Sequence, residues 1–159
     1  MNCKKWIAWM FLFLSSYATA GGAPGRAPGA IQTRTDRESP FNAEVIAAEE
    51  LKAKIARNEP VTIVDVRDTR SYVDSNGQIK GSIYVKLRRL RYRLSFPPLK
   101  NVSRDSEVVT YCACPHDEAS VRAAQILQDA GFKRVRVLKG GWQMWLKVNG
   151  QVESRAKAI

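Results

Sequence analysis

The residues best suited to chemistry lie in one short stretch, Cys112-Ala113-Cys114-Pro115-His116. This stretch follows the apolar run Val108 to Tyr111, which reads as a strand. It precedes Val121 to Ala130, where the apolar residues have helical spacing. A thiol between a strand and the N-terminus of the next helix lies where backbone N–H groups and the helix dipole favour a thiolate. The spacing therefore predicts a reactive cysteine, and Cys112, at the strand end itself, is the first candidate nucleophile.

The same stretch admits a second kind of chemistry. Cys112, Cys114 and His116 form a Cys-x-Cys-x-His cluster, whose soft sulfur and imidazole ligands suit Cu(I) or Zn, with Met144 as a candidate fourth ligand. His116 is the only histidine in the chain, and a solvated turn residue is its simpler interpretation. Our main interpretation requires no metal and no cofactor, and a soft-metal or redox-responsive protein remains an alternative.

Composition divides the chain into segments. Residues 1–20 have a basic start, a short apolar run and an Ala-Thr-Ala end, a pattern typical of a cleaved secretory signal peptide. Residues 21–39 are rich in glycine and proline, which predicts a flexible linker. One globular domain is expected over 40–153, with a tail at 154–159. We therefore expect a periplasmic or secreted protein with no stable membrane insertion after signal cleavage.

The formal net charge is +11, which indicates attraction to acidic or anionic partners. An exported protein rarely meets nucleic acid, so we expect no nucleic-acid function. The run from Arg88 to Arg93 carries four arginines and is typical of a solvated helix face. It is also a candidate surface for steering an acidic protein partner or a small anion toward the site.

Strand-like and helix-like segments alternate along the domain, which indicates an α/β fold with a mainly parallel sheet. We expect strands at 41–46, 61–66, 82–85, 108–111 and 135–138, helices at 47–57, 86–94, 121–130 and 142–148, and a short helix or turn at 69–74. Active sites in such sheets lie at the carboxyl ends of the strands. Cys112, Arg67 and the Gly140-Gly141 turn all fall at such ends and are expected to converge.

Several stretches together resemble a rhodanese-like domain. They occur in the family's order across about 110 residues. The five stretches are Glu49-Glu50-Leu51, Ile63-Val64-Asp65-Val66-Arg67, Gly77-Gln78-Ile79-Lys80-Gly81-Ser82, Val108 to Cys112, and Val135-Arg136-Val137-Leu138-Lys139-Gly140-Gly141-Trp142-Gln143-Met144-Trp145. In the third stretch, Gln78 stands in place of the family's histidine. The resemblance implies a three-layer α/β fold around a five-stranded sheet. It also implies a sulfurtransferase in which a cysteine becomes a persulfide and passes sulfur to a thiol or another nucleophilic acceptor, with thiosulfate as a common donor. Some members of the family are catalytically silent binding modules, which is the first alternative.

The active loop departs from the family's pattern, which is a cysteine, four residues, an arginine and a small hydroxyl residue that opens the helix. From Cys112 the loop to Ser120 is about two residues longer, and from Cys114 the arginine position holds Ala119. The nearest arginine, Arg122, lies within the helix. Asp117 and Glu118 suit the helix dipole but compete with an anionic substrate for the same N–H groups.

The resemblance places substrate binding on the loop and on nearby arginines, so the candidate residues are Ala113, Pro115, His116, Asp117, Glu118, Ala119, Ser120, Arg67 and Arg122. Arg67, with Asp65, is equally expected to tie the strand end to neighbouring loops. Cys114 is an alternative nucleophile or a resolving thiol that attacks a persulfide on Cys112, releasing hydrosulfide or protecting the thiol. A disulfide between the two cysteines would close a small strained ring and would be easily reduced.

Overall fold

The computed structural model describes residues 43–75 and 77–154. The predicted signal peptide at 1–20, the linker at 21–39 and the tail beyond residue 154 lie outside these ranges and stay predictions. Helices and strands alternate along the described chain in the order β1 Glu44–Ile46, α1 Ala48–Ala56, β2 Thr62–Asp65, α2 Thr69–Asp74, β3 Gln78–Ile79, β4 Ile83–Tyr84, α3 Leu90–Arg93, β5 Glu107–Tyr111, α4 Glu118–Asp129, β6 Arg134–Leu138, α5 Gly141–Lys147 and β7 Val152–Glu153. Two single 3-10 turns, Leu87–Arg89 and Leu99–Asn101, flank α3.

Five of the strands form one sheet in the order β1-β6-β5-β2-β4. Every neighbouring pair in this sheet is parallel, which confirms the predicted mainly parallel five-stranded sheet. The strand that delivers Cys112, β5, is central, and β2 is its neighbour. Because all carboxyl ends meet at one edge, the segments after β2, β4, β5 and β6 gather there.

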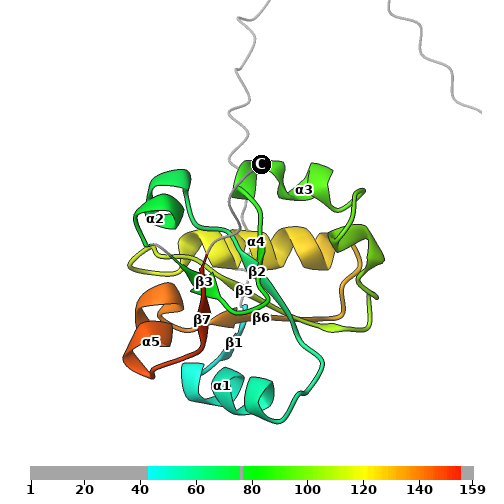
Figure 1. Cartoon of the computed structure of the whole chain (residues 1–159). Coiled ribbons are helices and arrows are strands. Elements are labelled where there is room, and N and C mark those ends of the chain that lie inside the picture. The colour runs from blue at the N-terminus through cyan, green and yellow to red at the C-terminus, as the bar shows by residue number, and fades with distance from the viewer. Residues whose placement is uncertain (1–42, 76, 155–159) are drawn as a thin grey trace, which may run out of the picture. The chain divides into compact units, whose positions relative to one another are not determined.

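Helices cover both faces of the sheet, as Figure 1 shows, and give the three layers implied by the resemblance. Buried residues of α3 and α4 pack with one side of β2, β5 and β6 in a first core, which includes Leu90, Ala123 and Leu127. Residues of α1 and α5 pack against the opposite side in a second core, which includes Leu51, Trp142 and Trp145. A sheet buried on both faces explains the continuous apolar runs of its strands.

Two local features differ from the expectations. A small antiparallel pair, β3 with β7, was not predicted, because strands of two residues carry no periodicity. The expected helix over 86–94 is instead a 3-10 turn followed by the single-turn helix α3, in a stretch crowded with arginines and closed by Phe96-Pro97-Pro98.

Gln78, which stands where the family has a histidine, joins β3 to its neighbours. Its side-chain amide donates to Ser82 O at 2.9 Å and to Glu153 Oε1 at 2.8 Å.

Within 43–75 and 77–154, no helix has both the length and the apolar content that a membrane crossing requires.

Candidate active site

The alternation of side chains along β5 decides which way Cys112 faces. Val108 and Cys112 belong to the core beneath α4, whereas Val109 and Tyr111 belong to the core beneath α1 and α5. Thr110, on the same face as Cys112, donates from Oγ1 to Ser120 O at 2.9 Å and ties the strand to the start of α4. The Cys112 side chain is 0% exposed. The strand register therefore directs the thiol toward the N-terminal turn of α4.

The loop from Cys112 to Asp117 is fastened to the turn between β6 and α5. Trp142 N–H donates to Cys112 O at 2.8 Å, and Gly140 N–H donates to Asp117 Oδ2 at 2.8 Å. Gly141 lies so close to the Cys112 carbonyl that a Cβ there would collide with it. The Gly-Gly turn therefore holds both ends of the cysteine loop, and its lack of side chains allows the close approach.

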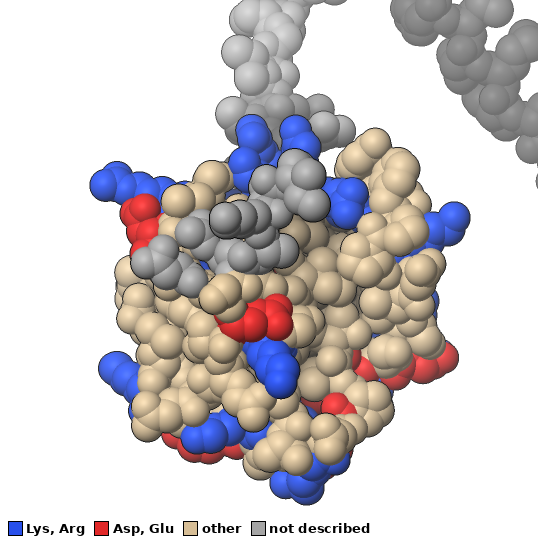
Figure 2. Space-filling model, viewed as in Figure 1, with Lys and Arg blue, Asp and Glu red and all other residues tan. Residues whose placement is uncertain are grey.

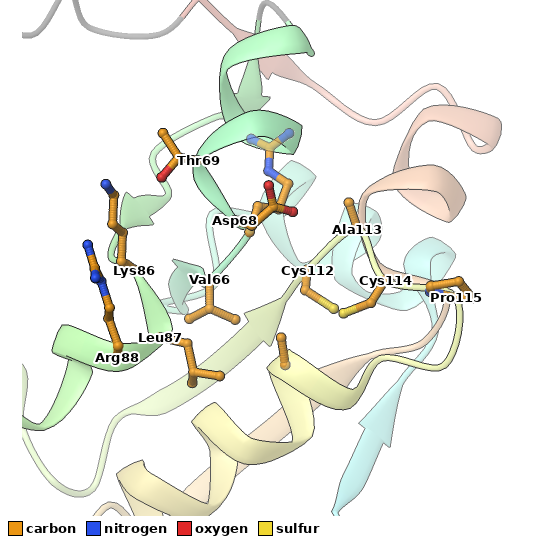
Figure 3. Close-up of a pocket in the computed structure, with 12 residues that line it drawn as sticks. Val66, Asp68, Thr69, Lys86, Leu87, Arg88, Cys112, Ala113, Cys114 and Pro115 are labelled. Carbon is orange, nitrogen blue, oxygen red and sulfur yellow. The ribbon is translucent and has the colours of Figure 1, made fainter.

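The two thiols lie face to face, and Figure 3 shows their sulfur atoms pointing toward one another. Burial and, to a smaller extent, a hydrogen bond with Cys112 raise the pKa of the Cys114 thiol to about 12. On its other side, Cys112 Sγ lies 3.6 Å from Ser120 Oγ. The Ser120 hydroxyl donates its single hydrogen to Asp117 O at 2.8 Å, which leaves its oxygen as an acceptor for the Cys112 thiol. Cys112 Sγ thus lies between the Cys114 thiol and the Ser120 hydroxyl.

A cavity of about 690 Å³ opens at this edge of the sheet, a volume typical of small-molecule sites. Three segments form its wall: residues 66–69 after β2, residues 86–88 after β4, and the cysteine loop with the start of α4. Figure 3 shows Lys86 and Arg88 across the cavity from Cys112 and Cys114. A buried thiol, a second thiol and two cations therefore border one cavity.

Comparison with known proteins agrees with this architecture. The family model for the rhodanese-like domain matches residues 47–148. The chain belongs to the rhodanese-like domain family. Relatives include the thiosulfate sulfurtransferase GlpE of Stutzerimonas stutzeri, 32% identical over 59% of this chain and 78% of that protein, and GlpE of Shewanella oneidensis, 35% identical over 56% and 79%.

Among solved structures, the Alr3790 protein from Anabaena sp. superposes with a TM-score of 0.59 at 32% identity, covering 69% of this chain and 82% of that one. A solution structure described as its rhodanese-like domain has a TM-score of 0.59 at 29% identity, covering 74% and 83%. Membership of the family, with sulfurtransferase relatives, supports sulfurtransferase activity in general for this chain.

The structure brings some of the predicted site residues of this rhodanese-like domain together and leaves others outside. Those that line the cavity are Cys112, Ala113, Cys114, Pro115, Ala119 and Arg67. His116, Glu118 and Arg122 are exposed on the outer side of the loop and helix, and they are not among the lining residues. Asp117 turns its carboxylate toward Gly140 N–H, and Ser120 is fully buried behind Cys112. The carboxylate of Asp117 therefore helps to fix the cysteine loop to the Gly140-Gly141 turn and does not line the cavity.

Arg67 has a guanidinium that is occupied within the protein. It is 1% exposed and forms a bidentate pair with Asp65, with Nη2 2.6 Å and Nε 2.9 Å from Oδ2. Its remaining donors reach Ser75 Oγ at 2.8 Å and Gly77 O at 2.9 Å. Tyr111 completes the cluster by donating its hydroxyl to Asp65 Oδ2 at 2.7 Å. These contacts bind the end of β2 to β5 and to the segment before β3.

Sequence reasoning missed several residues of the cavity wall: Val66, Asp68, Thr69, Lys86 and Leu87. Arg88, which also lines the cavity, was expected on a surface that steers an acidic partner or a small anion toward the site, and Lys86 was assigned to no site. Their place in the sequence was the available signal, because Lys86 and Arg88 follow a predicted strand directly. They therefore fall at the edge of the sheet where the carboxyl ends of the strands meet. Their placement beside residues 66–69 depends on the pairing of β4 with β2, which element order alone does not give.

The structure does not favour the soft-metal alternative. The described residues contain no group of three or more His, Cys, Asp or Glu side chains placed to hold a metal ion. Both thiols point inward to the cavity, whereas His116 is exposed.

Proposed function

We propose that this protein is a sulfurtransferase in which Cys112 carries sulfane sulfur as a persulfide and passes it to a thiol or another nucleophilic acceptor. The observation that carries the proposal is the position of Cys112, at the carboxyl end of central β5 and in the wall of a cavity of about 690 Å³. The start of α4 faces this thiol, where helix N–H groups stabilise an anionic sulfur. A catalytically silent module has no need for a thiol held in this way, so that alternative is not favoured.

Cys112 is the better nucleophile of the pair. Since burial raises the pKa of Cys114 to about 12, Cys114 remains a protonated thiol near neutral pH. A protonated thiol is a hydrogen-bond donor and a poor nucleophile. Cys114 therefore serves as a donor to the Cys112 sulfur in the resting state.

The donor that fits the cavity is a small anion that contains sulfane sulfur, and thiosulfate is the simplest. The relatives named GlpE are thiosulfate sulfurtransferases, and the cavity bears Lys86 and Arg88 opposite the thiols. The Cys112 thiolate attacks the outer sulfur of thiosulfate, the sulfur–sulfur bond of the donor breaks, and sulfite leaves with the bonding pair. The product is a Cys112 persulfide anion, and the total charge is unchanged. Lys86 and Arg88 supply the positive charge that the acidic loop lacks.

We also propose that the protein acts after export, in the periplasm or outside the cell. The pattern of residues 1–20 supports this location, because it has the three regions of a cleaved signal peptide. N-terminal sequencing of the protein recovered from its native host would test it. Cleavage after Ala20 is expected, and an N-terminus at Met1 would contradict it.

The deciding experiment for the activity is the intact mass of reduced protein after exposure to thiosulfate, with sulfite measured in parallel. The parent, Cys112→Ser and Cys114→Ser are compared. We expect sulfite release from the parent and from Cys114→Ser, and none from Cys112→Ser. Release that survives in Cys112→Ser but not in Cys114→Ser would move the nucleophile to Cys114. No sulfite from thiosulfate and no added sulfur atom from an organic persulfide, in any of the three proteins, would contradict sulfurtransferase activity.

A further inference from the structure

The proposed reaction uses one thiol and leaves the other without a chemical role. Cys114 nevertheless faces Cys112 directly, with the two side chains in hydrogen-bond contact (Figure 3). A thiol within reach of a persulfide is a potential attacking group for that persulfide. The pair is therefore a place where sulfur chemistry can continue after the first transfer.

We propose that Cys114 is the resolving thiol: it attacks the persulfide on Cys112, releases hydrosulfide, and leaves a Cys112–Cys114 disulfide that a dithiol reductant reopens. This inference rests on the proposed function, because it needs a persulfide on Cys112. It assigns the product of the second half-reaction and the chemical class of the acceptor. The protein then acts as a reductase of sulfane sulfur and not only as a carrier.

In the resolving step, the Cys114 thiol gives up its proton, and its sulfur forms a bond to Cys112 Sγ. The bond between Cys112 Sγ and the outer sulfur breaks, and the outer sulfur leaves with the bonding pair. It takes the proton and departs as hydrosulfide. The outer sulfur is reduced, the Cys114 sulfur is oxidised, and the single negative charge moves from the persulfide to the hydrosulfide.

The start of α4 partly compensates the charge of a Cys114 thiolate. The backbone N–H groups of Ala119, at the start of α4, and of Cys114 itself act to lower the pKa of the Cys114 thiol, against the larger effect of burial. These donors stabilise the negative charge that develops as the proton leaves. Burial opposes that charge, so the proton leaves Cys114 only as it passes to the outgoing sulfur of the persulfide. The hydrogen bonds from Gly140 N–H to Asp117 and from Trp142 N–H to the Cys112 carbonyl hold the loop, so both thiols stay opposite one another.

Exposure indicates how the disulfide is reopened. Cys114 is partly exposed at the cavity, so its sulfur is open to attack by an incoming thiolate. The pair is separated by Ala113 alone, and a disulfide in so small a ring is strained and easily reduced. Attack by one thiol of a dithiol forms a mixed disulfide on Cys114 and frees Cys112. The second thiol of the reductant then closes its own disulfide and releases the reduced protein.

The test is a single-turnover reaction under anaerobic conditions, with the full reduced chain and one equivalent of thiosulfate. Sulfite and hydrosulfide are both measured, and the intact protein is weighed after acid quenching. We expect the parent to release both products and to lose two hydrogens as a disulfide. Cys114→Ser is expected to release sulfite, to retain one added sulfur atom, and to release no hydrosulfide. The parent is expected to regain its thiols with dithiothreitol.

The outcomes separate this inference from the proposed function. Hydrosulfide release from Cys114→Ser equal to that of the parent, in the absence of added thiol, would overturn the resolving role. A parent that keeps the added sulfur atom would overturn it as well. If neither protein releases sulfite from thiosulfate, and Cys114→Ser gains no sulfur atom from glutathione persulfide, the proposed function itself fails. Circular dichroism of Cys114→Ser controls for folding, since serine replaces a partly exposed thiol of nearly equal size.

Discussion

At the residue scale, Cys114 differs from an ordinary surface cysteine through the burial that raises its pKa to about 12. A raised pKa keeps the thiol protonated below that value, so the reactive thiolate becomes more abundant as the pH rises. We predict that iodoacetamide alkylates Cys114 at pH 8 at least about a hundredfold more slowly than a free cysteine, and that the rate rises about tenfold per pH unit above pH 8. Peptide mass mapping of time points measures the rate at this position.

The Cys112→Ser protein is the control for this prediction, because it leaves Cys114 as the only cysteine of the described residues. Alkylation of Cys114 at the rate of free cysteine, or a rate that is flat between pH 7 and pH 9, would contradict the raised pKa and with it the assignment of Cys112 as the nucleophile.

The role of Arg67 depends on the contacts of its guanidinium, which its residue type alone does not give. The sequence places an arginine at the end of a strand beside the site, and there it was open to two interpretations. In the structure its donors are directed to Asp65, Ser75 and Gly77, and its guanidinium lies 4.3 Å from the ring centroid of Trp142. A buried pair of this kind is strongly destabilised when one partner is removed, by about 3–5 kcal/mol. Loss of activity on its substitution would therefore reflect folding first.

At the scale of elements, the turn between β6 and α5 controls the position of the cysteine loop. A Cβ at Gly141 would meet the Cys112 carbonyl, and the φ of +45° adds strain. We predict that Gly141→Ala loses about 1–3 kcal/mol of stability and forms the Cys112 persulfide more slowly, because the Cys112 carbonyl must move. Urea unfolding and single-turnover sulfite release measure the two effects.

Gly131→Ala is the matched control. Gly131 has a φ of +89°, but no atom lies within 4 Å of a Cβ placed there, so this substitution adds strain without a collision. It should cost similar stability and leave sulfite release intact. Equal slowing in both variants would show that general destabilisation, and not the contact with Cys112, accounts for the effect.

The elements themselves were largely predictable, and their pairing was not. Apolar runs and helical spacing located β2, β5, β6, α1 and α4 to within a few residues, because each segment has a buried side and its period is visible. The position of Cys112 at a strand end followed from the same pattern. The order of strands did not, and it is the pairing of β4 with β2 that brings Lys86 and Arg88 to the cavity. The bond from Gly140 N–H to Asp117 Oδ2 joins residues 23 apart and has no local signal.

At the scale of the whole molecule, positive charge is abundant but dispersed. The chain has a formal net charge of +11, and Figure 2 shows basic side chains scattered over the face in view, several of them beside carboxylates. A dispersed charge attracts anions to the surface in general and does not select the site. Arg67 also borders the cavity, but its guanidinium is held by Asp65, so selection depends on Lys86 and Arg88.

Reversing the charges of Lys86 and Arg88 tests whether these two side chains select the donor anion. Lys86→Glu and Arg88→Glu should each raise the KM for thiosulfate about tenfold at low salt, and the effect should shrink as ionic strength rises. Lys133→Glu makes the same change in net charge, but Lys133 precedes β6 and so lies at the opposite edge of the sheet, where its partner is Asp105. Its KM should stay near that of the parent. A rise of equal size in Lys133→Glu would assign the effect to net charge, and no rise in the other two would mean that the donor anion binds without these cations.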